Sequence, residues 1–210
     1  MRRHLRRVAP VLGCLLAGSL LLFLAVSAAR WQDALASGDA RFRSAPDGRL
    51  WDPGRLAAGS FSKSALGIDD DLGFRHAVQS FRLSHPEQPA NSNPALVVYR
   101  NEATVQLTDI ERHAKDPEWR STAANLLGVL SYSDAVYDYV HRTRLLANAA
   151  QRFQQAIAFE PDNEDAKFNL ELTLGLSRGI RLAENGGGAN PAPGGKGSKG
   201  AGAGDPGSGY

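Results

Sequence analysis

The chain has 210 residues, of which 42% are hydrophobic, and a formal net charge of +2. This length fits one modest globular domain with appendages and is too short for two ordinary domains. Four arginines lie within the first seven residues, so the rest of the chain has a formal charge of −2. The charge therefore argues against a nucleic-acid-binding face. Cys14 is the only cysteine, which excludes an internal disulfide bond and a thiolate metal site.

A long uncharged segment follows the basic residues 1–7. It covers residues 8–29, and at 1.5 Å per residue its twenty-two positions make about 33 Å of helix, enough to cross a hydrocarbon core of about 30 Å. The charged residues behind the segment are mixed in sign. The positive-inside rule therefore predicts a single-pass helix in the cell membrane, with a cytoplasmic N-terminus and everything after Ala29 outside the cytoplasm.

The same segment has features of a cleaved signal peptide. The small residues at Val26-Ser27-Ala28-Ala29 suit signal peptidase. The apolar run is longer than the core of about 7–15 residues that signal peptides have, which favours a retained anchor. Both interpretations export the rest of the chain.

Two segments rich in helix breakers flank the central region. Residues 30–60 contain six glycines and prolines, which predicts a linker with at most one short helix near residues 31–42. Residues 185–210 hold eleven of the twenty-two glycines and almost no apolar side chain larger than alanine. Such a tail cannot bury enough surface to offset the entropy of ordering, so we expect it to be disordered.

Residues 61–184 have apolar side chains at three- and four-residue intervals, the pattern of amphipathic helices in an all-α fold. We interpret Asp69–Asp71 as a helix N-cap rather than a metal site. Asp116-Pro117 is a strong helix start signal, and Glu160-Pro161 ends another helix. The expected helices contain Leu72 to Phe81, Ala103 to Ile110, Trp119 to Leu130 with a continuation to Val140, Leu145 to Ile157, and Ala166 to Leu174.

One of these runs has the spacing of a known repeat. An alanine, an aromatic residue four positions on, a small residue three further and a proline five after that let two helices approach closely before a tight turn. The chain has this spacing in Ala149, Phe153, Ala156 and Pro161. It resembles the second helix of a tetratricopeptide repeat, and Leu170 resembles the opening of the helix that follows.

The first helix of such a repeat carries leucine-glycine and a nearby aromatic residue, which Leu127-Gly128 and Tyr132 resemble. They lie about nine positions too far upstream, so an insertion around residues 132–144 is required. The second-helix spacing recurs 72 residues earlier, in Ala77, Phe81, Ser84 and Pro89. Because this separation is not a multiple of about 34 residues, we expect an irregular array. A generic helical bundle with small residues at its contacts is the alternative.

The order of these features resembles a bacterial family. The membrane helix, the linker, Ala65 to Asp71, Asn125 to Gly128 and Phe153 to Leu174 are similar to tetratricopeptide membrane proteins encoded beside MoxR-type ATPases and von Willebrand factor A proteins. The resemblance implies an extracytoplasmic accessory subunit of a membrane complex, with members of that complex as partners. It implies no catalytic residues.

If the helix pairs stack as in tetratricopeptide proteins, the first helices line a concave groove. We expect Asn125, Val129 and Tyr132 to lie there and to contact a partner protein. The alternative for Val129 is ordinary packing, and for Asn125 a capping or solvated role.

No constellation of residues predicts catalysis. The five histidines have no pair at i and i+4, and the helical region has no nucleophile elbow and no phosphate-binding loop. We therefore predict no metal, no cofactor, no small-molecule substrate and no enzyme activity. The predicted function is a membrane-anchored scaffold that binds another protein. The alternative is an exported envelope enzyme or modifying factor without a recognisable catalytic motif.

Overall fold

The computed structural model describes residues 2–53, 60–89 and 92–186, and in these ranges all regular structure is helical, with no strand. The expected all-α fold is confirmed for these residues. The predicted glycine-rich tail lies, from residue 187 onward, outside the described ranges. The helices are α1 (Arg2–Phe42), α2 (Ser60–Leu66), α3 (Asp69–Leu83), α4 (Pro94–His113), α5 (Pro117–Tyr137), α6 (Arg142–Phe159) and α7 (Glu164–Gly186).

The first helix, α1, is 41 residues long, and among the described helices it alone is long and apolar enough to cross a membrane. Its leucines from Leu12 to Leu22 are 49–67% exposed, so the rest of the described chain leaves them uncovered, as a lipid-facing surface requires. The helix continues without a break past Ala29 to Phe42. The predicted span and the predicted short helix after it are therefore one element.

The end of α1 and the chain after it form a small core against α3. The buried members of this core are Trp31, Leu50, Trp51 and Leu72. Gly38 lets Trp51 lie against α1, because a Cβ at position 38 would come within 2.3 Å of the Trp51 ring. Asp39 accepts a hydrogen bond from Trp51 Nε1 at 2.7 Å and pairs with Arg75 of α3 at 3.0 Å. Part of the segment that breaker density identifies as a linker thus packs on the helical array.

The acidic residues Asp69–Asp71 occupy the first turn of α3 and not its N-cap position. The N-cap residue is Ile68, and its side chain makes no capping hydrogen bond. The preceding Gly67 has a φ of +66°, a left-handed conformation that glycine adopts without steric strain. The carboxylates therefore stabilise α3 through their charge at the positive end of the helix dipole.

Side-chain caps begin the next two helices. Asn93 Oδ1 accepts from the N–H of Ala95 at 2.9 Å at the start of α4. Asp116 Oδ1 accepts from the N–H of Glu118 at 2.9 Å at the start of α5. A proline follows each cap as the first helical residue, where its missing N–H is not needed. The start signal at Asp116-Pro117 is confirmed.

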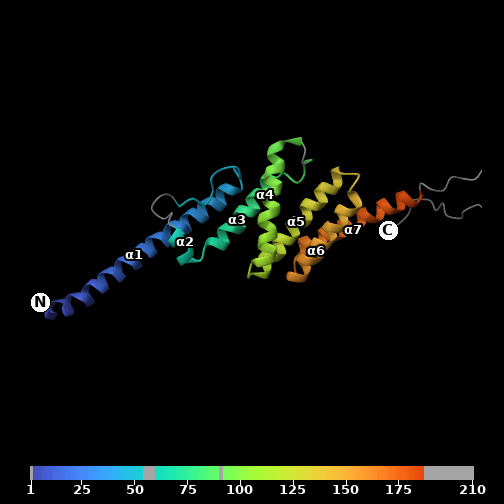
Figure 1. Cartoon of the computed structure of the whole chain (residues 1–210). Coiled ribbons are helices and arrows are strands. Elements are labelled where there is room, and N and C mark those ends of the chain that lie inside the picture. The colour runs from blue at the N-terminus through green and yellow to red at the C-terminus, as the bar shows by residue number, and fades with distance from the viewer. Residues whose placement is uncertain (1, 54–59, 90–91, 187–210) are drawn as a thin grey trace, which may run out of the picture.

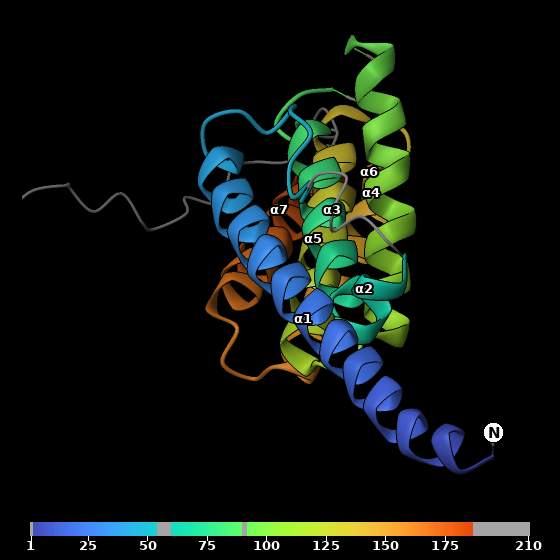
Figure 2. The ribbon, with the colours of Figure 1, turned by 90° about the vertical axis from the view of Figure 1, so that its left-hand side faces the viewer.

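Helices α3 to α7 follow one another in an elongated array, with α1 at one end and α7 at the other (Figure 1). Figure 2 views the array from the end that carries α1. Small residues lie where the helices meet, which allows close packing. The first cluster joins α3, α4 and α5 through Ala77, Ala103, Leu107, Ala123, Leu127 and Leu130, and the second joins α5, α6 and α7 through Ala124, Ala156 and Ala166.

Phe153 of α6 lies directly against the backbone of Gly128 in α5. A Cβ at position 128 would lie 2.5 Å from Cε1 of the Phe153 ring, which is less than any ordinary contact. Phe153 is 1% exposed, so its ring has no free space into which to move. The absence of a side chain at position 128 therefore lets α5 and α6 pack together.

We predict that Gly128→Ala lowers the free energy of unfolding by about 1–2 kcal/mol, because overpacking outweighs the gain in helix propensity. Gly73→Ala in α3 is the matched control, since its Cβ would meet nothing within 4 Å. It should leave the free energy unchanged or raise it by up to about 1 kcal/mol. Urea denaturation of the full chain in detergent micelles measures both. Equal losses in the two variants would contradict the role given to Gly128.

Candidate functional site

The three predicted partner-binding residues lie in one stripe of α5, and the structure gives them different surroundings. Asn125 is 8% exposed, and its Oδ1 accepts from Asn169 Nδ2 of α7 at 3.0 Å. Val129 and Tyr132 are half-buried. Asn125 therefore holds α7 against α5, and only Val129 and Tyr132 offer part of their surface to a partner.

The residues predicted to pack the repeat are divided between core and turn. Ala149, Phe153 and Ala156 are buried in α6, where Phe153 covers Gly128. Pro161 is exposed in the turn after α6, and Leu170 is half-buried in α7. The small residues of α6 thus face its neighbours, as the close approach of two helices requires.

The turn between α6 and α7 is fixed by two polar side chains. Ser121 of α5 donates its hydroxyl to the carbonyl of Ala156 at 2.8 Å. Asn163 Nδ2 donates to the Ser121 Oγ at 2.8 Å, while its Oδ1 accepts from the N–H of Ala166 at 2.9 Å. Asn163 therefore caps α7. The part played by Ser121 has no signal in the local sequence, because its partners lie more than thirty residues away.

A polar groove of about 660 Å³ lies between α4, α5 and α6 and is the main candidate for a binding site. We call it the basic groove, because three arginines and one glutamate lie in its wall. Ser131, Asn148 and Gln151 add hydroxyl and amide groups. Such a lining differs from the apolar walls that bind most small molecules. The groove instead suits a polar, anionic ligand.

The charged side chains of the basic groove differ in how far they are already engaged by neighbouring residues. The carboxylate of Glu111 is 7% exposed and pairs with Arg152. Arg120 Nε donates to the backbone carbonyl of Glu111 at 2.9 Å, and its guanidinium lies 4.0 Å from the centre of the Phe159 ring. Arg112 is exposed. With one carboxylate against three guanidinium groups, the groove has a net positive charge that favours an anionic ligand.

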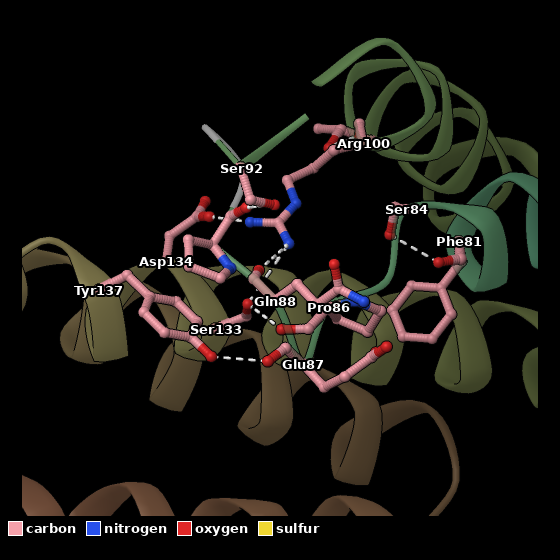
Figure 3. A network of polar contacts seen from close by, with 12 residues as sticks. Phe81, Ser84, Pro86, Glu87, Gln88, Ser92, Arg100, Ser133, Asp134 and Tyr137 are labelled. Atoms are coloured by element: carbon pink, nitrogen blue, oxygen red, sulfur yellow. Dashed lines mark hydrogen bonds and ion pairs between the residues drawn. The ribbon is translucent and has the colours of Figure 1, made fainter. Parts of the chain in front are cut away.

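A second polar network joins the loop after α3 to α5 (Figure 3). Arg100 of α4 is 6% exposed, pairs with Asp134 and donates to the carbonyl of Gln88 at 3.3 Å. Ser133 donates to the carbonyl of Pro86, and Tyr137 donates to the carbonyl of Glu87 at 2.6 Å. The serine and tyrosine hydroxyl groups thus donate to backbone carbonyls. The network holds the loop after α3 in place.

The described residues contain no group of three or more histidine, cysteine, aspartate or glutamate side chains that could hold a metal ion. His76, His85, His113 and His141 are exposed and lie on different elements. The side chain of His4 lies outside the described part. These four histidines therefore form no cluster with one another in the described part of the chain.

The sequence matches no protein-family model, and neither a curated protein nor a solved structure matches it. Support for a function therefore comes from the side chains that this chain exposes on its own surface. The basic groove is the feature that sequence reasoning missed. Its charged residues come from three helices, and they share no spacing along the chain that could have revealed them.

We predict that Arg100→Met lowers the free energy of unfolding by about 1–3 kcal/mol, because Asp134 and the carbonyl of Gln88 lose their donor and α4 loses its polar link to α5 and to the loop after α3. Arg112→Met on the same helix is the control, and as an exposed substitution it should change the free energy by less than about 0.5 kcal/mol. Urea denaturation of the full chain in micelles compares the two. Indistinguishable midpoints would show that the network in Figure 3 contributes nothing to stability.

Proposed function

We propose that the chain is a membrane-anchored scaffold that holds an acidic segment of another protein in the basic groove, on the extracytoplasmic side. The observation that carries the proposal is the gathering of Arg112, Arg120 and Arg152 in one groove. In our proposal the helices from α5 to α7 form an irregular tetratricopeptide-like unit. The contact of Phe153 with Gly128 supports this, because the repeat uses small residues to bring paired helices together.

The groove is suited to bind reversibly. Glu111 takes up part of the charge of Arg152, and Arg120 is stacked on Phe159. Arg112 is free to turn toward a ligand, because it is exposed and has no hydrogen bond or ion pair with another described residue. A carboxylate of the partner would meet a fork of N–H donors there, the geometry in which arginine binds carboxylates best. We propose that the partners belong to the ATPase and von Willebrand factor A complexes that the sequence resemblance implies.

The proposed orientation follows from the charges around α1. Arginines precede the apolar segment, and mixed charges follow it, so the positive-inside rule keeps the first residues in the cytoplasm. The single cysteine makes this orientation testable. After Cys14→Ser, we predict that a membrane-impermeant maleimide labels Lys115→Cys in intact spheroplasts and labels Arg3→Cys only after lysis. The reverse labelling pattern would place the array in the cytoplasm and remove the proposed function.

We further predict that Arg112→Glu reduces the recovery of partner proteins from detergent extracts about tenfold, since an attractive charge at the groove becomes a repulsive one. Arg144→Glu is the matched control, because Arg144 is exposed on α6 outside the groove. Quantitative mass spectrometry of the captured proteins measures both variants. Partners that are recovered equally with the two variants would exclude the basic groove as their binding site.

A further inference from the structure

The last helix of the array has two apolar faces. One face packs on α5 and α6, where Ala166 and Thr173 are completely buried. On the opposite side Phe168, Leu172 and Leu182 are 66%, 46% and 71% exposed. Gly175 and Gly179 lie between these residues, and a Cβ on either would meet nothing within 4 Å. We call these five residues the outer face of α7.

The spacing on the outer face is that of a helix seam. Its residues follow one another at intervals of four, three, four and three, which is the heptad pattern of two helices in contact. Single exposed apolar residues are common on protein surfaces, but a stripe along four turns is not. Each glycine inside a helix costs about 1 kcal/mol relative to alanine. No contact with another described side chain accounts for either glycine, whereas two glycines four residues apart allow a second helix to come close.

We propose that the outer face of α7 binds the same face of α7 in a second copy of this chain, with the two helices antiparallel. In this register Phe168 lies opposite Gly179 of the second copy, and Leu172 lies opposite Gly175 of the second copy. Phe168 and Leu172 then each enter a notch left by a glycine. A two-fold axis repeats both contacts, so the face is complementary to itself.

The charges beside the outer face favour an antiparallel arrangement of the two α7 helices and a second copy of this chain as the partner. Glu171 and Arg178 are exposed on the same flank of the outer face, and neither forms an ion pair with another described residue. The antiparallel register brings Glu171 next to Arg178 of the second copy, and the two-fold axis repeats the pair. A parallel arrangement would place the same residues beside Leu176 and Ala183 and would leave both charges unpaired. A helix of a different protein would fit the outer face only if it carried the same large residues, glycines and flanking charges in the antiparallel order.

This contact is independent of the basic groove, which lies between α4, α5 and α6. One helix pair buries less area than a standard interface of about 1,600 Å², so we expect a reversible dimer rather than a permanent one. Confinement of both copies in one membrane would raise their effective concentration. Failure of the dimer would leave the proposed scaffold function untouched, and failure of the scaffold would leave the dimer untouched.

The test is the association of the full chain in density-matched detergent micelles, measured by sedimentation equilibrium. We expect the unsubstituted chain to dimerise. Arg178→Glu should weaken the dimer about tenfold or more, because two attractive pairs become repulsive. The double variant Glu171→Arg with Arg178→Glu should restore it, since the pairs re-form with their signs exchanged. Arg144→Glu is the matched control and should leave association unchanged.

Gly175→Leu supplies a second measurement that does not depend on charge. Its side chain would enter open space in the monomer, so the helix content and unfolding midpoint should be retained while the dimer is lost. A contact between two α1 helices would respond to none of these substitutions. A chain that stays monomeric, or one whose association ignores both Gly175→Leu and Arg178→Glu, would overturn the proposal. The first result would assign the outer face to an unlike helix.

Discussion

The separation of α5 and α6 is set by the ring of Phe153, which fills the space where a side chain at position 128 would lie. At this short separation Ser121 of α5 reaches the end of α6, and Asn163 in the next turn binds the same hydroxyl group. Because Asn163 also caps α7, the direction of the last helix depends on the same packing. The basic groove and the outer face of α7 are therefore both positioned by a residue without a side chain.

The two surfaces differ in chemistry and in place. The basic groove lies among three helices and offers guanidinium groups, which recognise carboxylates in specific directions. The outer face of α7 offers aliphatic and aromatic carbon, with charge only on its flank. Since α7 turns its other side to α5 and α6, a ligand in the groove leaves the outer face free. One chain could thus bind the proposed partner and a second copy at the same time.

Local chemistry made the helices predictable. Asp116-Pro117 marks the start of α5 and Glu160-Pro161 marks the end of α6. Both could be predicted because capping and the missing proline N–H act within a few residues. Contacts between distant residues could not be predicted in this way. Asn125 was expected to face a partner, yet its amide is bound to Asn169, which is 44 residues away. The basic groove was missed for the same reason, and Trp31 and Trp51 form a core in a segment whose glycines and prolines indicate a linker.

The unbroken course of α1 has a mechanical consequence. At 1.5 Å per residue its 41 residues form a rod of about 60 Å, and the far end of that rod is held by Trp31, Trp51 and the ion pair between Asp39 and Arg75. A helix whose apolar length exceeds the bilayer tilts to fit it. Because no hinge separates the rod from the core beside α3, any such tilt swings the whole array. A change in bilayer thickness would thereby change the angle between the array and the membrane surface.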